Sequence, residues 1–561
     1  MNVSRSKSDK NEIKQQQSQK PNSYRGIMKK REKSSLLWMI VVYSLVLCFT
    51  FSLAVAQNKS GIFGKTGESI TATVVETDIA KEDKELQKKL KKLREYVKSV
   101  LEDSKVPGIA IGIIKDGEVV FAEGFGYRNL EKKLPVTTQT LFAICSCSKA
   151  FTTMSIGMLV DDGEVEWGKP VRNYLPSFQL KDPYITANMT VRDLVTHRSG
   201  LPGHGAIWYG SSFTRKEIFD RLRYLDFSKG FREVYQYNNL MFMTAGYLVG
   251  QATNSTWENF VRNRIFRPLD MTHSNFFIED LKRDSDYATP YNIEGEKVEV
   301  IPFRNCENIG PAGSINSCID DMLKWIQFHI NKGKVGEKQL VPESIVKDMR
   351  TPYMHISSGM KSNELSHANY GLGWRIYMYR GHKLVTHGGG IDGFTSSTSF
   401  MPFDSLGVFV VTNAESRISQ SSRMIDLYIY DLLLGVEPKD RYAEYKERQE
   451  KAKKGKKKKK EKERVEIINP TYPLKKYVGE YEHPGYGIFT ITCKDDTLWG
   501  KFKSFEFKLE HRNYNTFKTI VNIQYAKITV TFFINVKGDI DKLTSPLEPR
   551  VDEIVFKRKV P

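Results

Sequence analysis

The chain has 561 residues, of which 40% are hydrophobic and 27% charged, and it carries a formal net charge of +19. This length leaves room for two or three domains, and the composition is typical of a globular protein rather than a disordered one. Most of the charge lies in two segments, since residues 1–35 carry +7 and residues 446–464 carry +8. A nucleic-acid-binding domain carries positive charge on the folded domain itself, so we expect no nucleic-acid partner.

The N-terminal segment predicts export. Residues 36–56 are mostly apolar and uncharged, and a stretch of about 20 such residues can cross a bilayer. Basic residues within 1–35 favour a cytoplasmic N-terminus. The stretch ends in "AVA-Q", which signal peptidase could cut after Ala56. We expect either a single-pass type II membrane protein anchored by this segment, or a protein secreted after cleavage; both place the rest of the chain outside the cytosol or in the secretory lumen.

Glycosylation and disulfide formation are the chemistry that such export would permit. Three Asn-x-Ser/Thr triplets, at Asn58, Asn188 and Asn254, predict a glycoprotein if they lie on the surface. No pair of cysteines has CxxC spacing, and we expect no metal and no organic cofactor. Cys306 and Cys318 could pair, but spacing does not establish connectivity. The six cysteines are Cys48, Cys145, Cys147, Cys306, Cys318 and Cys493.

The predicted elements begin after a polar linker at residues 57–80. Residues 81–104 predict an amphipathic helix because their leucines and valines recur at helical spacing. "PGIAIGIIKDGEVVFAEGFG" (107–126) predicts a β-hairpin around an Asp-Gly turn. Helices and loops are expected through residues 165–335, and three successive strands within 382–413.

Strands at both ends of a helical region predict an α/β domain with one antiparallel sheet, which we place at residues 81–437. The Lys-rich segment 438–467 is predicted to be a solvated linker, with a polyanion or membrane-surface contact as the alternative. Residues 468–561 alternate apolar and polar residues between turn signals, which predicts a separate all-β domain.

The first candidate for chemistry is "CSCSKAFTT" (145–153). Ser146 and Lys149 are three residues apart, so on a helix they share one face. A lysine whose pKa is lowered by burial or by another cation can accept the serine's proton. Ser-x-x-Lys also occurs in "SIVK" and "SGMK", but only "SCSK" joins an apolar strand-like run to an apolar helix. The neighbouring Cys145 and Cys147 are interpreted as buried packing residues.

The second candidate is "YQYNNLMFMTAGYL" (235–248). Tyr237 is a weak base at its usual pKa of about 10, but beside a protonated lysine its phenolate is stabilised and can move a proton. Asn239 offers a donor and an acceptor that could orient a lysine and a substrate amide. Alone, the motif is more typical of a packing tyrosine with a helix-capping asparagine.

The third candidate is "HGGGIDG" (387–393), at the end of a strand-like run. Glycines there let a ligand or another segment approach the backbone closely. The N–H groups of Gly390 and Ser146 could form an oxyanion hole, and His387 could meet a carboxylate or carbonyl of the substrate. Alone, a glycine cluster after a strand is more often a turn.

Together and in this order, the three motifs resemble the class C β-lactamase-related serine hydrolases, a group that includes CubicO-type esterases and D-amino-acid peptidases. The resemblance runs from about residue 85 to 435 and includes "TVRDLVTHRSGLP" (190–202) and "GPAGSINSCIDDMLKW" (310–325). It implies the β-lactamase/transpeptidase-like fold, an antiparallel sheet sandwiched by helices with a helical subdomain. Residues after 468 resemble the small lipocalin-like module that follows this domain in some relatives.

The resemblance also implies roles. Ser146 would be the acylated nucleophile, Lys149 and Tyr237 would share the general acid/base work, and Asn239 would hold the substrate and Lys149. His387 and Gly389 match the place where β-lactamases have Lys-Thr-Gly. A histidine is only partly charged at neutral pH, which points to peptidase or esterase relatives.

Besides the histidine at position 387, the chain departs from these relatives at Cys145, where they commonly have glycine. It either crowds the nucleophile turn or is tethered by a disulfide.

We therefore expect a serine hydrolase that cleaves a small peptide, amide or ester substrate outside the cytoplasm, with assembly into a homo-oligomer left open. The alternatives are a true β-lactamase and a catalytically retired, membrane-anchored binding ectodomain. The presence of Ser146, Lys149, Tyr237 and Asn239 counts against a retired site.

Overall fold

The computed structural model describes residues 68–357, 364–415, 421–460, 468–519 and 528–559. The chain divides into two compact units, residues 1–85 and 86–561. The predicted membrane or signal segment 36–56 and the basic residues before it lie outside the described part. Within the described part, no helix combines the length and the apolar character needed to span a membrane.

The first described element is helix α2 (Glu68–Ser104). It begins at Glu68 rather than at residue 81, so the predicted linker 57–80 is helical from residue 68 onward. Residues 68–80 contain neither proline nor glycine, and nothing in them stops a helix. The apolar stripe that predicted the helix is buried, and beyond it Tyr96 stacks on Tyr428 with ring centroids 3.7 Å apart. The buried members of the stripe are Leu90, Leu93, Val97 and Val100.

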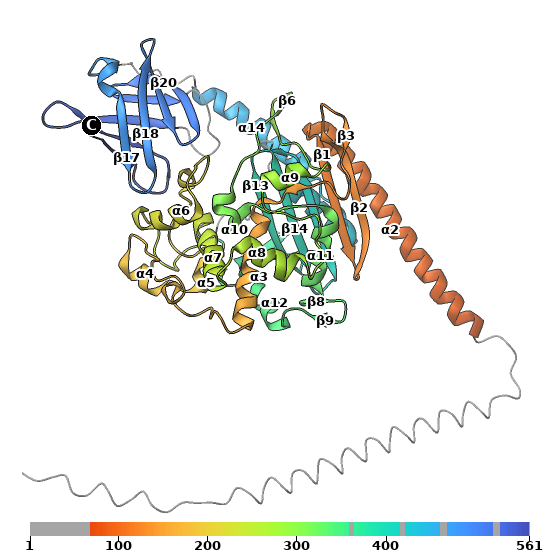
Figure 1. Ribbon diagram of the computed structural model, residues 1–561. Helices are drawn as coiled ribbons and strands as arrows, with labels where there is room; N and C mark the ends of the chain where they lie inside the picture. Colours follow the sequence, from red (N-terminus) through yellow and green to blue (C-terminus); the bar gives the residue numbers. More distant parts are fainter. Residues whose placement is uncertain (1–67, 358–363, 416–420, 461–467, 520–527, 560–561) are drawn as a thin grey trace, which may run out of the picture. The chain divides into compact units, whose positions relative to one another are not determined.

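A nine-stranded antiparallel sheet forms the centre of the α/β domain (Figure 1). Its strand β1 pairs with β2 on one side and with β15 on the other, which joins the start of the domain to its end, as the sequence predicted. The β1–β2 turn has positive φ at Asp116 and Gly117, as an Asp-Gly hairpin requires. In sheet order the strands are β10 (Met354–His355), β11 (Leu365–Tyr370), β12 (Arg375–Tyr379), β13 (His382–Ile391), β14 (Phe394–Met401), β15 (Leu406–Thr412), β1 (Gly108–Lys115), β2 (Glu118–Asn129) and β3 (Leu134–Pro135).

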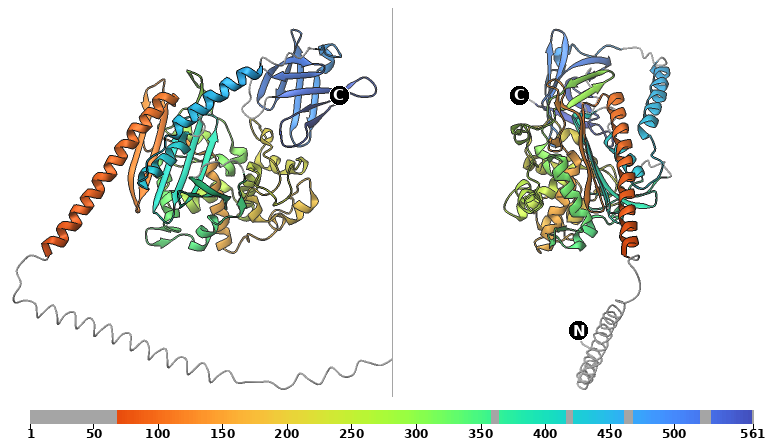
Figure 2. Two further views of the ribbon diagram at one scale, coloured as in Figure 1. Left: turned by 180° about the vertical axis from the view of Figure 1, so that it is seen from behind. Right: turned by 90° about the vertical axis from the view of Figure 1, so that its right-hand side faces the viewer.

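Strand β14 shows how the sheet separates its two helix layers. Side chains alternate between the faces of a strand. Ser397 and Ser399 donate to Asp426 of α13 (Ser421–Leu433) at 2.9 and 2.6 Å. Ser396, the residue before Ser397, points to the opposite face and donates to Ile144 O at 2.8 Å, on the side of Ser146. Figure 2 shows the sheet between these layers.

The helices on the nucleophile's side cover the sheet and form the predicted helical subdomain. α11 packs directly on β1, β14 and β15, and α3 packs against α7, α8, α10 and α12. The sandwich predicted from the sequence is confirmed. The helices are α3 (Ser148–Asp161), α4 (Pro183–Asn188), α5 (Val191–Leu194), α6 (Arg215–Arg221), α7 (Asn239–Ala252), α8 (Trp257–Val261), α9 (Ile278–Arg283), α10 (Gly310–Gly313), α11 (Ile319–Ile330) and α12 (Glu343–Met349).

The Lys-rich segment differs from the prediction, because most of it is helix α14 (Arg441–Lys460). Lysine, glutamate and arginine are good helix formers, and i,i+4 pairs such as Glu444–Arg448 support an exposed helix. Its first residue is tied to the α/β domain, since Arg441 lies 2.8 Å from Asp431 and 2.7 Å from Glu364.

The C-terminal strands form a closed eight-stranded barrel, which confirms the predicted all-β domain. Pairing of β17 with β24 closes it, and inward-facing aromatic rings such as Phe489, Phe507 and Phe556 fill its interior. The strands are β17 (Gly479–His483), β18 (Gly487–Lys494), β19 (Thr497–Phe502), β20 (Phe505–Asn513), β21 (Thr516–Thr519), β22 (Thr529–Ile534), β23 (Ile540–Ser545) and β24 (Ile554–Arg558).

The barrel contacts the α/β domain at residues 204–213. Ser504 N donates to Gly210 O at 3.0 Å, and Phe505 stacks on Tyr209. Nearby, His204 N donates to the carboxylate of Glu548 at 2.8 Å. Because these backbone and ring contacts fix the barrel to loops of the helical subdomain, the two domains form one compact unit.

Candidate active site

The nucleophile turn is the 3₁₀ turn η1 (Cys145–Cys147), between β4 (Phe142–Ala143) and α3. Cys145 has φ 53, a left-handed conformation that costs a residue with a side chain about 1–2 kcal/mol. Glycine avoids this cost, which gives a physical reason for the glycine that relatives commonly have at this position. Cys145 Sγ donates to Ala143 O at 3.3 Å. No disulfide joins any of the cysteines in the described part of the chain, so of the two alternatives the structure shows the strained turn.

The structure brings Ser146, Lys149 and Tyr237 together. Ser146 Oγ lies 3.1 Å from Lys149 Nζ and accepts a hydrogen bond from Tyr237 Oη at 2.7 Å. Lys149 Nζ also donates to Ala312 O at 2.7 Å and lies 4.8 Å from the centre of the Tyr237 ring. Ser146 is partly exposed whereas Lys149 is fully buried. The hydroxyl is therefore open to a substrate, while the lysine amine and the tyrosine phenol contact it from within the protein.

Burial favours the neutral forms of the Lys149 amine and the Tyr237 phenol. It holds the pKa of Lys149 well below its usual range, and Arg375 lowers that pKa further while nearby thiols oppose the shift. Burial also raises the pKa of Tyr237, against a smaller lowering by its hydrogen bond to Ser146. A neutral amine is a base and a neutral phenol is an acid, so the two environments give the pair complementary roles.

Asn239 lies at the head of the predicted apolar helix. It is the first residue of α7, and its neighbour Asn238 caps the helix by accepting from Met241 N at 2.9 Å. No hydrogen bond between Asn239 and Lys149 occurs among the described residues; the carbonyl of Ala312 holds the lysine instead. The Asn239 side-chain oxygen is buried and lacks a hydrogen-bond partner within the described chain. Its expected contact with substrate stays a prediction.

His387 is buried and uncharged. It is 1% exposed, and burial together with Lys149 and Arg375 holds its pKa well below the usual range. Its Nδ1 lies 2.8 Å from Gly388 O and its Nε2 lies 3.0 Å from Tyr370 Oη. This pattern fits a neutral ring with the proton on Nδ1. Since both nitrogens have protein partners, the expected contact between His387 and the substrate also stays a prediction.

The glycines of β13 differ in the space around them. A side chain at Gly389 would place its Cβ 2.3 Å from Ile144 O and 2.9 Å from Cys145 Cβ, so only glycine lets the strand lie against the nucleophile turn. A Cβ at Gly390 would meet nothing within 4 Å. The backbone at Gly390 therefore borders open space beside the turn, as an oxyanion-hole donor requires.

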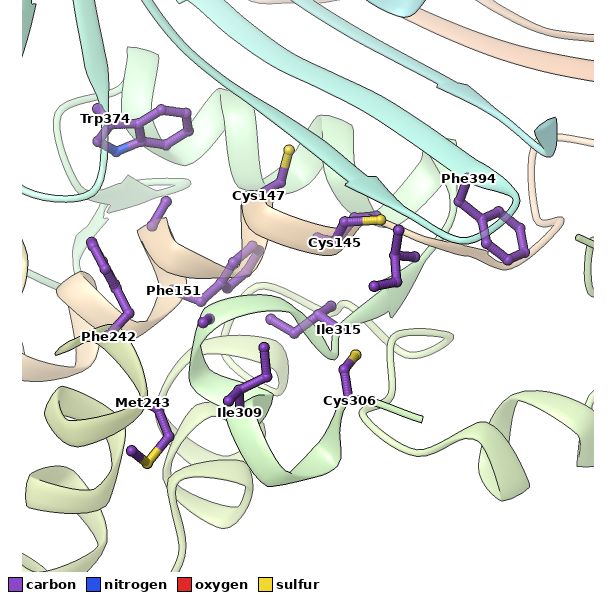
Figure 3. Packing of buried hydrophobic residues seen from close by; sticks show 14 of the residues in the cluster. Cys145, Cys147, Phe151, Phe242, Met243, Cys306, Ile309, Ile315, Trp374 and Phe394 are labelled. Atoms are coloured by element: carbon purple, nitrogen blue, oxygen red, sulfur yellow. The ribbon is translucent and has the colours of Figure 1, made fainter. Parts of the chain in front are cut away.

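The Cys147 side chain packs against the sheet, where it is not placed to act as a nucleophile. Its sulfur lies 3.2 Å from His387 O and 3.3 Å from Ser396 Oγ, and burial raises the pKa of its thiol. Figure 3 shows the Cys147 side chain directed toward the strands. The interpretation of Cys145 and Cys147 as buried packing residues is confirmed by their 2% exposure.

The sequence analysis assigned no role to the residues that surround Lys149 and Tyr237. His197 lies under Tyr237 with ring centroids 4.3 Å apart, and its Nδ1 accepts from Asn238 N at 3.1 Å. The sequence did contain a signal for His197, because this residue belongs to the family-like segment "TVRDLVTHRSGLP" (190–202). Tyr370 and Arg375 had no such signal, since they lie on strands far along the chain. The described residues contain no cluster of three or more His, Cys, Asp or Glu side chains suited to a metal ion.

Comparisons with known proteins agree with this geometry. The profile of the family described as beta-lactamase matches residues 93–428, and that of a domain of unknown function, DUF3471, matches residues 463–558. An unguisins hydrolase of Aspergillus campestris is 30% identical over 428 residues, which covers 72% of this chain and 77% of that protein. Protein flp of Staphylococcus aureus is 25% identical over 322 residues, covering 56% of this chain and 61% of flp.

Two solved structures share the fold. The octameric penicillin-binding protein homologue from Pyrococcus abyssi matches with a TM-score of 0.56 and 25% identity, covering 83% of this chain and all of that chain. D-amino acid amidase from Ochrobactrum anthropi matches with a TM-score of 0.50 and 23% identity over 61% of this chain and 98% of that chain, which shows the fold alone. From the family profile, the sequence relatives and the placement of Ser146 against Lys149 and Tyr237, the chain belongs to the β-lactamase family and is a serine hydrolase.

Proposed function

We propose that this hydrolase cleaves amide or ester bonds of small peptide-like substrates through an acyl-enzyme on Ser146. The observation that carries the proposal is the pair of contacts at Ser146 Oγ, 3.1 Å from Lys149 Nζ and 2.7 Å from Tyr237 Oη. The printed names of an unguisins hydrolase and of a D-amino acid amidase support amides as the first substrates to test.

Acylation begins at the neutral Lys149. Ser146 Oγ forms a bond to the substrate carbonyl carbon while its proton passes to the lysine amine. The carbonyl oxygen becomes an oxyanion, for which the N–H groups of Ser146 and Gly390 are the proposed donors. A preorganised donor of this kind contributes about 10²–10³-fold to the rate.

Tyr237 completes the step. As the carbonyl–nitrogen or carbonyl–oxygen bond breaks, the leaving group takes the phenolic proton, and the proton held by Lys149 restores the neutral tyrosine. The products are the Ser146 ester and a neutral leaving group. In deacylation a water molecule attacks the ester carbonyl and gives its proton to the same pair, which releases the acid and restores the serine hydroxyl.

The same proposal places the catalytic domain outside the cytoplasm. Its support is the sequence alone: the apolar residues 36–56 and the basic residues before them. We expect the domain to be digested by protease on intact cells or, if it is lumenal, to be protected in sealed microsomes until detergent is added; digestion in sealed microsomes without detergent would contradict the proposal.

A fluorophosphonate probe tests the nucleophile. The wild type should be labelled and Ser146→Ala should not. Ser344→Ala removes the exposed serine of the second Ser-x-x-Lys pattern, "SIVK", and should be labelled like the wild type. Unchanged labelling of Ser146→Ala would overturn the assignment. A chromogenic cephalosporin, run beside peptide amides and esters, separates β-lactamase activity from the proposed one.

A further inference from the structure

The turn between β13 and β14 lies directly after the proposed oxyanion donor. Asp392 is in this turn, two residues after Gly390, and β14 begins at Phe394. Residues 388–390 are all glycines, so they have no side chains that could hold the end of β13 by packing. The position of the Gly390 N–H therefore depends on pairing with β14 and on the turn itself. The turn lies near Cys145 in Figure 3, where Phe394 is labelled.

Tyr209 and Arg304 hold Asp392 in this turn. Asp392 Oδ2 accepts a hydrogen bond from Tyr209 Oη at 2.6 Å and another from Arg304 Nε at 2.9 Å. The second carboxylate oxygen, Oδ1, has no hydrogen-bond partner within the described residues. A hydrogen bond to a charged group contributes about 1.5–3 kcal/mol. Tyr209 thus supplies one of two strong contacts that fix the carboxylate.

The C-terminal barrel in turn holds Tyr209. Phe505, the first residue of β20, stacks on Tyr209 with ring centroids 5.8 Å apart and an angle of 10° between the rings. The guanidinium carbon of Arg304 lies 4.4 Å from the centre of the Tyr209 ring and 5.4 Å from that of Phe505. Gly210 has φ 63, and a Cβ there would lie 2.3 Å from the Phe505 ring. Only a glycine at position 210 lets the barrel approach this closely.

We propose that Tyr209 is a positioning residue for the oxyanion hole, that it acts through Asp392 on the Gly390 N–H, and that the barrel holds it in place. The inference rests on the proposed function and deepens it, because it gives the C-terminal domain a part in the reaction. An oxyanion donor lowers the barrier when it is aligned before the charge develops. Tyr209 contributes to that alignment through the turn, and not by contact with the substrate.

The oxyanion hole can be probed by replacing the carbonyl oxygen of the substrate with sulfur, which accepts hydrogen bonds weakly. The test compares p-nitrophenyl acetate with its thiono analogue, in which C=S replaces C=O. In the wild type, the preference in kcat/KM for the oxygen ester should exceed the preference shown by hydroxide about tenfold or more. Tyr209→Phe keeps the ring stack but removes the donor to Asp392. It should lower kcat/KM for the oxygen ester about tenfold and that for the thionoester much less.

Two further variants separate this role from a purely structural one. Tyr353→Phe is the matched control, because Tyr353 also donates a hydrogen bond to a carboxylate, that of Asp348 in α12. It should keep the wild-type kcat/KM for both esters. Phe505→Leu removes the stack from the barrel side and should reduce the preference for the oxygen ester in the same direction, by a smaller factor. Thermal melting checks the folding of each variant, and if Tyr209→Phe does not fold, Phe505→Leu decides.

An unchanged preference in Tyr209→Phe would overturn the inference, as would a wild-type preference no greater than that of hydroxide. Equal losses on the two esters in Tyr209→Phe would show that Tyr209 supports the fold and not the oxyanion hole. A reduced preference in Tyr209→Phe with a wild-type preference in Phe505→Leu would reject the part assigned to the barrel. Wild-type protein that hydrolyses neither ester and is not labelled by a fluorophosphonate would instead reject the proposed function.

Discussion

The nucleophile turn and the barrel contact each bury a lysine amine, and the two differ in what the amine meets. Lys149 Nζ lies 3.1 Å from Ser146 Oγ and donates to Ala312 O. Lys503 Nζ has no hydrogen-bond partner within the described chain and lies 3.6 Å from the centre of the Phe213 ring. One amine faces a hydroxyl that it can deprotonate, whereas the other faces a hydrocarbon ring.

Burial lowers the pKa of both lysines, to about 7 for Lys503 and well below the usual range for Lys149. A shifted pKa is often used to find active sites, yet here the shift is common to both positions. The difference is that only Lys149 has a hydroxyl group, Ser146 Oγ, within hydrogen-bond distance. A perturbed lysine therefore marks a catalytic site only where a reacting group lies within hydrogen-bond distance, and the following variants test that distinction.

Lys149→Met should have the largest effect on activity. The variant keeps the buried hydrocarbon but removes the base, and kcat/KM should fall about 10³–10⁴-fold. Lys503→Met makes the same change at the barrel contact and should leave kcat/KM at the wild-type level. The measurement is hydrolysis of an activated ester, with thermal melting as a check on folding. Equal losses in both variants would show that burial of a lysine, rather than its contact with Ser146, controls activity.

Tyr237→Phe should have the next largest effect, and its size should depend on the leaving group. Removal of the phenol should lower kcat/KM for an amide about 10²–10³-fold, because a leaving amine needs a proton. A p-nitrophenyl ester leaves without one, so its kcat/KM should fall much less. Parallel assays of an amide and an ester with the same acyl group measure the difference. Equal losses on both substrates would assign Tyr237 to positioning Ser146 rather than to proton donation.

Gly389→Ala tests how closely the nucleophile turn is held against β13. The added Cβ would lie 2.3 Å from Ile144 O, so the turn must shift, and a displacement near 1 Å can cost about 10²-fold in activity. Gly388→Ala is the matched control, because its Cβ would meet only Ser396 O at an ordinary 3.6 Å. Wild-type activity in Gly389→Ala would mean that the strand does not constrain Ser146.

Lys503→Met should have the smallest effect, and on stability alone. The pKa of Lys503 is about 7 in the folded state and about 10.4 in the unfolded state. The penalty for burying the ammonium is therefore complete below pH 7, shrinks as the pH rises from 7 to 10, and then disappears. The difference between these two pKa values corresponds to about 4 kcal/mol, so the variant should gain up to about this amount in the free energy of unfolding at pH 6 and little at pH 10. Melting curves at both values measure this; a gain that is independent of pH would point to packing instead.

Local patterns in the sequence were sufficient for the framework of the protein. The Asp-Gly turn, the three strands after residue 382 and the alternating strands after residue 468 were predictable because turn chemistry and side-chain period are local properties. The Ser146–Lys149 spacing likewise placed both groups on one face of a turn. The start of α2 was predicted at residue 81 instead of 68, and the Lys-rich segment was predicted to be a linker instead of a helix. Such runs of good helix formers end only at a stop signal or a tertiary contact, and the run itself does not show where that is.

The tertiary structure decided the state of the site. That Ala312 O accepts a hydrogen bond from Lys149, that His387 Nε2 lies beside Tyr370 Oη, and that Asp392 Oδ1 has no partner within the described residues all depend on contacts between segments far apart in the chain. Burial, which sets the protonation of Lys149, is a property of the packed domain and not of any motif. The sequence by itself therefore determined the fold and the motifs that meet at the candidate site, because both follow from local patterns, and the packing determined the charge and the partners of the residues in those motifs.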